Sequence, residues 1–111
     1  MPVLDGHEIK TKPTTHGIAS LRMIGLNADI IVGRCELEVP REIREKIGHF
    51  TNVKHEYVIS AHNVKNVFEV PLVFAKQAFH DVLAERLGLG KVELKLDHWV
   101  ALNERIANLE E

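Results

Sequence analysis

The chain has 111 residues, of which 45% are hydrophobic and 27% are charged, and its formal net charge is -2. This length allows one ordinary domain with a single core, and the composition argues against a disordered chain. The weak negative charge argues against a general nucleic-acid binder, since such domains are usually clearly basic. Composition therefore indicates a globular protein and names no function.

The cellular location follows from what the sequence lacks. No apolar run approaches the roughly 20 residues that a membrane-spanning helix requires. Residues 1–8 lack the apolar core of a signal peptide. The one cysteine, Cys35, cannot form a disulfide within the chain. We therefore expect a reduced, cytoplasmic protein without membrane association.

The first quarter of the chain predicts a strand end, a loop and a helix. Pro2-Val3-Leu4 is typical of the end of a buried strand whose beginning is missing, and Asp5-Gly6 predicts a turn. Lys10–Thr15 has no apolar period and predicts a loop, because Pro13 disfavours helical geometry at the residue before it. We expect Thr14 or Thr15 to cap a helix that stops at Gly25. Its apolar positions at helical spacing are Ile18, Leu21 and Ile24.

The middle of the chain predicts two strands around a helix. Ala28–Gly33 is rich in β-branched residues without alternation, which predicts a strand buried on both faces, as in parallel sheets. Pro40 is expected to be the first residue of the helix. Tyr57–Ile59 predicts the second strand, which ends at Ser60–Asn63. The apolar stripe predicted for the helix is Ile43, Ile47 and Phe50.

The last third predicts two helices. Pro71 opens the longest helix and Gly88 closes it, with one apolar face formed by Leu72, Ala75, Phe79, Val82 and Leu83. Lys91–Leu96 alternates charged and apolar residues and fits an edge strand or an extended linker. Asp97 is expected to cap the last helix, whose face carries Trp99, Leu102, Ile106 and Leu109. The alternation of strands and helices predicts an α/β fold with a mainly parallel sheet.

Ligands bind such sheets where strands end and loops lead into helices. Lys10–Thr15 and Ser60–Val64 lie at such places. The first segment has two ammonium groups, three threonine hydroxyls and the N–H groups of a helix start, which together suit a phosphate ester. The alternative is a solvated turn with two surface lysines, and spacing alone favours that alternative.

Lys46 lies at the edge of the predicted stripe rather than opposite it. Its aliphatic stem could pack there while the ammonium group reaches a ligand. Taken by itself, the residue is better explained as a surface lysine.

Gly88-Leu89-Gly90-Lys91 is not a phosphate loop of the Walker type. That motif needs a glycine where Glu85 stands and a serine or threonine where Val92 stands. The seven histidines are scattered, none forms the close pair typical of zinc helices, and Cys35 has no second sulfur ligand nearby.

No catalytic group is predicted. Cys35 has no adjacent base, which a nucleophile needs. Asp29 and Asp81 could serve as catalytic carboxylates, but turn and helix-surface roles are far more common for such residues. The residues alone therefore define no enzyme.

An ordered series of motifs makes the lysine-rich loop more specific. It starts at Lys10-Thr11-Lys12-Pro13-Thr14 and continues through His16, Ser20–Leu26, Asp29–Arg34, Lys46-Ile47, Phe50–Val53, Val58–Ser60 and Glu69–Leu72. In this order, over roughly Pro2 to Leu89, the chain closely resembles the CTP synthase family.

The resemblance implies a fold and an activity. The matching stretch is internal to the synthetase (amidoligase) domain, so it implies part of a parallel-sheet, P-loop-like (Rossmann-like) domain with a C-terminal helical appendage. Residues 1–90 would be the later part of that domain, and residues 91–111 a linker and its last helix. The family is a ligase of pyrimidine biosynthesis that works as a tetramer. ATP phosphorylates the uracil O4 of UTP with magnesium present, and ammonia then displaces the phosphate to give CTP.

The resemblance also implies binding residues. UTP and the feedback inhibitor CTP would contact Lys10, Thr11, Lys12, Pro13, Thr14, Thr15 and Lys46, and the adenine side of ATP would contact His62, Asn63 and Val64. Two positions depart from the family pattern. Thr15 stands where the family has glutamine, and His62-Asn63 replaces a lysine followed by an acidic residue.

Several parts of the family are missing from this sequence. It has no glycine-rich phosphate loop, no set of magnesium carboxylates and no glutaminase nucleophile, so the Mg²⁺ ligands and the glutaminase domain that supplies ammonia are expected outside this segment. We expect a fragment that is inactive alone. The alternative is a non-catalytic nucleotide-binding or oligomerisation module.

Overall fold

The computed structural model describes residues 3–5 and 8–109, with side chains from Thr11 to Leu109. It consists of two compact units, Met1–Asn63 and Val64–Glu111, and each is described by itself. The predicted boundary near residue 90 separates parts of a family domain, whereas these two units are divided by compactness. The predicted domains, residues 1–90 and 91–111, therefore stay a prediction.

The first unit begins with two short strands, β1 (Val3–Asp5) and β2 (Glu8–Lys10), which pair antiparallel. A strand is therefore confirmed at Val3-Leu4, whereas Pro2 and Gly6 lie outside the described residues. β2 was not predicted, and it includes Lys10, the first residue of the predicted loop.

Helix α1 (Lys12–Met23) begins three to four residues earlier than predicted, with Thr11 rather than Thr14 or Thr15 as its N-cap. Pro13 lies in the first turn of this helix. The first N–H groups of a helix have no intrahelical acceptor, so a proline there costs no hydrogen bond. The helix ends before Gly25, whose φ of +86° confirms the predicted stop.

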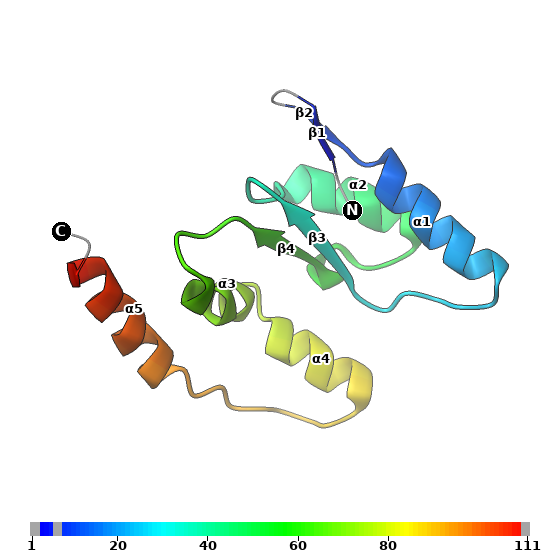
Figure 1. The fold of residues 1–111 in the computed structure, drawn as a ribbon. Coiled ribbons are helices and arrows are strands. Elements are labelled where there is room, and N and C mark those ends of the chain that lie inside the picture. Colours follow the sequence, from blue (N-terminus) through cyan, green and yellow to red (C-terminus); the bar gives the residue numbers. More distant parts are fainter. Residues whose placement is uncertain (1–2, 6–7, 110–111) are drawn as a thin grey trace. The chain divides into compact units, whose positions relative to one another are not determined.

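Strands β3 (Ile31–Cys35) and β4 (Val58–His62) form the predicted parallel pair. Figure 1 shows the two arrows side by side and pointing the same way. β3 starts and ends later than predicted, and a short 3-10 helix η1 (His55–Tyr57) occupies the residue predicted to begin β4. The carboxyl ends of both strands therefore lie at the same edge of the sheet.

The prediction that β3 is buried on both faces is wrong. Ile31, Gly33 and Cys35 are buried, whereas Val32 and Arg34 are exposed. Successive side chains of a strand point to opposite faces, so only one face of β3 is covered within the described chain. A run of β-branched residues indicates a strand, but it does not show whether one or both faces of that strand are covered by other parts of the protein.

Helix α2 (Arg41–Thr51) connects β3 to η1 and β4, and it packs against α1, η1 and β4. Pro40 is its N-cap rather than its first residue. The buried side chains of this unit meet around α2 and the two parallel strands; the largest fully buried ones are Ile47, Ile59, Val39, Val58, Thr51 and Ser60.

The predicted stripe of α2 is wrong at one position. Ile47 is fully buried, but Phe50 is 62% exposed, and the buried residues beside Ile47 are Gly48 and Thr51. At about 100° per residue, this places the centre of the buried face about 80° away from the predicted stripe. The neighbours of the helix decide which face is covered, and the apolar spacing alone does not.

The second unit is helical. It contains a 3-10 turn η2 (Val67–Glu69) and helices α3 (Val70–Lys76), α4 (Phe79–Leu87) and α5 (Asp97–Leu109). α3 packs against α4, and α5 packs against η2 and α3. The aromatic rings of Phe74 and Phe79 lie 5.2 Å apart between centroids, and those of Phe68 and Trp99 lie 6.2 Å apart.

The single helix predicted from Pro71 to Gly88 is wrong, because the chain breaks between α3 and α4. Ala78 adopts a left-handed conformation with φ of +56°, which interrupts the helical ladder. Gly88 does end α4, with φ of +68°. Residues 91–96 form no strand, so the extended linker is confirmed and the edge strand is excluded. The last helix is confirmed, although Asp97 is its first residue rather than the predicted cap before it.

Candidate functional site

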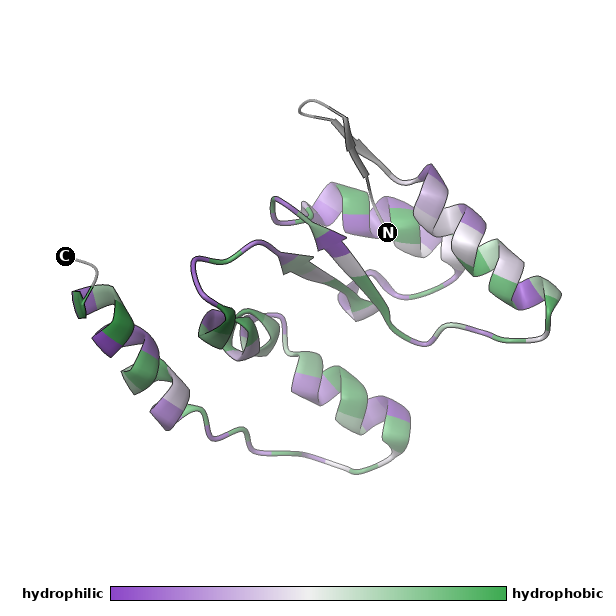
Figure 2. Cartoon of the chain, in the orientation of Figure 1, coloured by the Kyte–Doolittle hydropathy of each residue, from purple (hydrophilic) through white to green (hydrophobic). Residues whose placement is uncertain are grey.

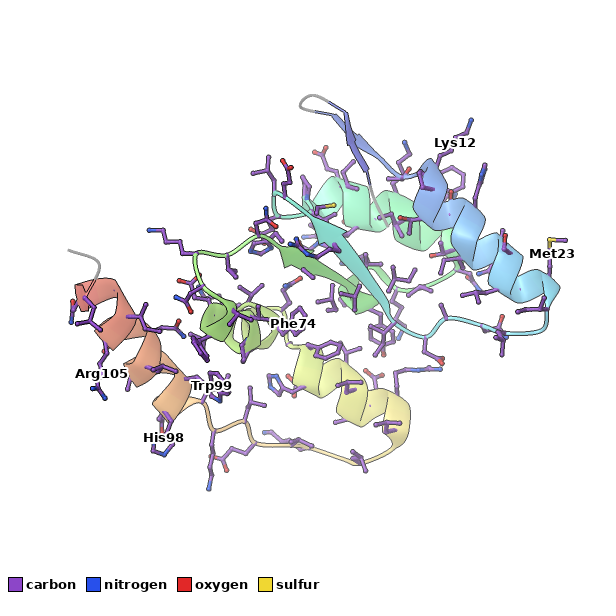
Figure 3. All side chains as sticks on the ribbon, in the orientation of Figure 1. Lys12, Met23, Phe74, His98, Trp99 and Arg105 are labelled. Carbon is purple, nitrogen blue, oxygen red and sulfur yellow. The ribbon has the colours of Figure 1, made fainter. Side chains whose placement is uncertain are left out.

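The first turn of α1 presents a cation to solvent. Lys12 is the first residue of the helix and is exposed, and its side chain extends away from the ribbon in Figure 3. The first turn contains no acidic residue. Within that turn, the unpaired N–H groups and partial positive charge of the helix start are therefore not offset by a carboxylate. This end of α1 suits an anion.

The threonines at this turn behave differently from one another. The Thr15 hydroxyl donates to the Lys12 carbonyl oxygen at 3.1 Å, so it is used within the helix. Thr11 and Thr14 are buried, and Thr14 Oγ1 has no hydrogen-bond partner among the described residues. Pro13 is exposed beside them. Of the three hydroxyls predicted to face a phosphate, two are therefore buried.

Lys46 lies on the second turn of α2 and is exposed. Because the buried face of α2 is formed by Ile47, Gly48 and Thr51, Lys46 lies about 150° from the centre of that face rather than at its edge. The predicted position of Lys46 at the edge of the buried face is therefore wrong, and its exposed side chain agrees with the alternative of a surface lysine. That Lys46, Lys12 and Lys10 contact the same nucleotide stays a prediction.

The carboxyl end of β4 holds the second candidate segment. His62 is the last residue of β4 and is half-buried, and its Nδ1 lies 3.1 Å from the Ser60 hydroxyl. The Asn63 N–H donates to the Glu36 carbonyl oxygen at 3.2 Å. His62 and Asn63 thus lie where the two parallel strands end, which is the place where sheets of this kind bind ligands. Val64, the third predicted residue, belongs to the second unit.

Ser60 is a residue to which the sequence analysis gave no role of its own. It is fully buried, and its hydroxyl accepts a hydrogen bond from the Val39 N–H at 2.9 Å. The available signal was a hydroxyl directly after the apolar pair Val58-Ile59, at a predicted strand end. Its contact with Val39 spans 21 positions of sequence, and no local pattern reveals such a contact.

The structure gives no catalytic role to the cysteine and the two aspartates considered above. Cys35 is buried, and burial raises the pKa of its thiol, which disfavours the reactive thiolate. Asp29 and Asp81 are exposed. Within the described ranges, no three histidine, cysteine or acidic side chains lie together as metal ligands would. In that same part of the chain, no helix is both long and apolar enough to cross a membrane.

The fold and the positions of these residues are typical of α/β proteins that bind phosphorylated ligands. The first unit is a small α/β unit with a parallel strand pair, a cationic helix start and polar residues at the strand ends, as in proteins that bind phosphorylated ligands at such edges. Residues 1–89 match the family described as the CTP synthase N-terminus. The chain belongs to the CTP synthase family.

Individual relatives agree with this assignment. The chain is 44% identical over 100 residues to the CTP synthase of Methanopyrus kandleri. The matched stretch covers 90% of this chain and 19% of that protein. It is 42% identical over 104 residues to the CTP synthase of Aquifex aeolicus, with 94% and 20% covered. The CTP synthase of Methylobacterium nodulans is 39% identical over 104 residues, with 93% and 19% covered. The chain thus spans about a fifth of the length of these relatives.

Proposed function

We propose that this chain supplies nucleotide-binding residues of a CTP synthase, with one site for UTP or the inhibitor CTP and part of a site for ATP. The proposal combines the family membership with the chemistry of two places in the first unit. The first is the start of α1, and the second is the carboxyl end of β4.

The observation that carries the proposal is the start of α1. Lys12 is exposed there on a helix turn without an acidic residue, and the matching family motif runs from Lys10 to Thr14. An ammonium group about 4 Å from a phosphate charge gains roughly 1 kcal/mol in water and about 4 kcal/mol at an effective dielectric of 20. Lys12, Lys10 and Lys46 would together hold the anionic tail of the nucleotide. Thr11, Pro13, Thr14 and Thr15 would shape the turn around it.

The ATP part of the proposal rests on His62, Asn63 and Val64. His62 is the last residue of β4 and Asn63 follows it, both in the first unit. The family pattern has a lysine and an acidic residue where this chain has His62-Asn63, so the side-chain chemistry differs. Backbone groups can form the same contacts in either case.

In the reaction proposed for the complete enzyme, ATP phosphorylates the uracil O4 of UTP and ammonia displaces the phosphate. The ammonia comes from glutamine in a glutaminase domain, and the enzyme is a cytoplasmic tetramer. Magnesium would offset phosphate charge in that enzyme. The described residues contain no cluster fit to hold it, so we assign this chain no magnesium ligand. Its own residues bind and orient nucleotides, and none is assigned a chemical step.

A titration of the chain with UTP tests the proposal, with isothermal calorimetry as the readout. We expect saturable binding, and Lys12→Ala weakens it about fivefold, which corresponds to roughly 1 kcal/mol. Lys95→Ala is the matched control, because it removes the same charge from an exposed position in the linker. Equal losses in both variants, or no saturable binding by the unmodified chain, contradict the proposal.

A second candidate function, self-association, is favoured by apolar side chains at the end of α1. Met23 is 87% exposed, Ile24 73% and Leu26 55%. The ribbon there is coloured as hydrophobic in Figure 2, and Met23 extends away from it in Figure 3. An exposed cluster of this kind is typical of an association surface. Sedimentation at several concentrations tests it. A dimer that is unaffected by UTP and lost in Met23→Ser/Ile24→Ser supports this function.

A further inference from the structure

Ser60 and His62 lie on the same face of β4. In the parallel register, Ser60 is opposite Gly33 and His62 is opposite Cys35. Side chains two residues apart in a strand point to the same side. Gly33, Cys35 and Ser60 are buried, and His62 is half-buried at the open end of that row. The row therefore runs from the core to the sheet edge where we propose that ATP binds.

The Ser60 hydroxyl has two contacts, one within β4 and one with another segment of the chain. It accepts a hydrogen bond from the Val39 N–H at 2.9 Å, and it lies 3.1 Å from Nδ1 of His62. Val39 belongs to the segment that leads from β3 into α2, and the same segment accepts a hydrogen bond from the Asn63 N–H through the Glu36 carbonyl oxygen. Two hydrogen bonds thus tie this segment to the end of β4.

We infer that Ser60 is a positioning residue for nucleotide binding. Its hydroxyl holds the imidazole of His62 at Nδ1, so that Nε2 is the ring nitrogen turned to an adenine nucleotide at the end of β4. This inference rests on the proposed ATP contact of His62. The ring is fixed from the buried side, and its side-chain freedom is lost before the ligand binds. Pre-organisation of this kind raises affinity because less ordering remains to be done in the complex.

A double-mutant cycle with ATP as the probe tests the inference. Ser60→Ala, His62→Ala and the double variant are titrated with ATP as 111-residue chains, and dissociation constants are obtained from NMR shifts. We expect Ser60→Ala to weaken ATP binding roughly threefold to tenfold. If Ser60 acts through His62, the double variant binds ATP no more weakly than His62→Ala.

A second readout separates positioning from simple loss of stability. The ¹⁵N resonance of His62 Nδ1 is expected to shift in Ser60→Ala because its hydrogen-bond partner is gone. Thr51→Val is the matched control. Thr51 is 1% exposed, and its hydroxyl donates to the Ile47 carbonyl oxygen within α2. That variant also loses a buried hydroxyl, yet it should leave both the ATP affinity and the Nδ1 resonance unchanged. Where Ser60→Ala does not fold, Ser60→Cys keeps the side-chain size with a weaker hydrogen-bonding atom, and the same losses are expected.

The outcomes distinguish this inference from the proposed function. If the unmodified chain binds ATP but Ser60→Ala weakens binding equally with and without His62, the inference is overturned and the ATP site stands. An unchanged Nδ1 resonance in Ser60→Ala overturns it as well. Absence of saturable ATP binding by the unmodified chain overturns the proposed ATP contact and this inference together.

Discussion

Gly48 is where a single atom decides whether α2 can pack. A Cβ added there would lie 2.5 Å from the Val53 carbonyl oxygen, which is backbone. That backbone is held in place, because the Val53 N–H donates to the Gly48 carbonyl oxygen at 3.2 Å. Glycine at this position therefore lets the end of α2 and the chain leading to η1 approach closely.

Gly48→Ala is expected to lower the free energy of unfolding by about 1–2 kcal/mol. Because the clash is with backbone, the overpacking cost is expected in the upper part of the range of about 1–3 kcal/mol, and the gain in helix propensity returns only about 1 kcal/mol. Gly17→Ala is the control: Gly17 lies in α1, and a Cβ there would meet no atom within 4 Å. That variant should gain roughly 0.5–1 kcal/mol. Urea denaturation followed by circular dichroism measures both, and equal effects would refute the close contact.

At the same scale, the sequence was informative about chemistry and uninformative about exposure. The threonines around Lys12 were expected to face a ligand together, yet Thr14 is 4% exposed and the Thr15 hydroxyl bonds within the helix. Residue type shows what a side chain can bind. Which side of a helix turn it occupies depends on where the helix begins, and Thr11 shifts that start.

At the scale of elements, the junction of α3 and α4 shows how a helix is divided without proline or glycine at the break. Ala78 adopts φ of +56° and ψ of +35°. Its N–H donates to the Ala75 carbonyl oxygen, and its own carbonyl oxygen accepts from the Asp81 and Val82 N–H groups. Ala78 therefore lies between the two helices in a left-handed conformation, which is unfavourable for residues that have a Cβ atom.

Ala78→Val is expected to lower the free energy of unfolding by about 1–3 kcal/mol, because a β-branched side chain is strained at positive φ. Ala78→Gly should not lower it, since glycine adopts this conformation freely. Ala101→Val in the exposed part of α5 serves as the control, where only the small propensity difference applies. Thermal unfolding followed by circular dichroism gives the comparison. A tolerated valine at position 78 would contradict the left-handed junction.

Elements were predicted well where the signal is local. Both parallel strands, the helix after Pro40, the stop at Gly25 and the last helix from Asp97 appear within a few residues of their predicted positions. The break at Ala78 was missed, because the apolar spacing from Leu72 to Leu83 continues across it. Apolar spacing shows which side chains one continuous helix would bury, and it does not show where the backbone leaves helical geometry.

At the scale of the whole molecule, the chain spans about a fifth of its relatives. We expect no CTP formation by the 111-residue chain with UTP, ATP, magnesium and ammonia, because the roles that we propose for its residues are binding roles and include no chemical step. The assay follows CTP by chromatography, with the Aquifex aeolicus CTP synthase as positive control. CTP above the protein-free background would contradict the expectation of an inactive fragment.

The sequence alone determined the family and the α/β class, because ordered motifs and local periodicities depend on residue identity and spacing. It also predicted the two candidate segments, Lys10–Thr15 and Ser60–Val64, whose binding roles stay a prediction. Only the tertiary structure decided which face of α2 is buried, where α3 gives way to α4, and that Ser60 joins Val39 to His62. Those features depend on which distant segments pack together, and a one-dimensional pattern does not contain that information.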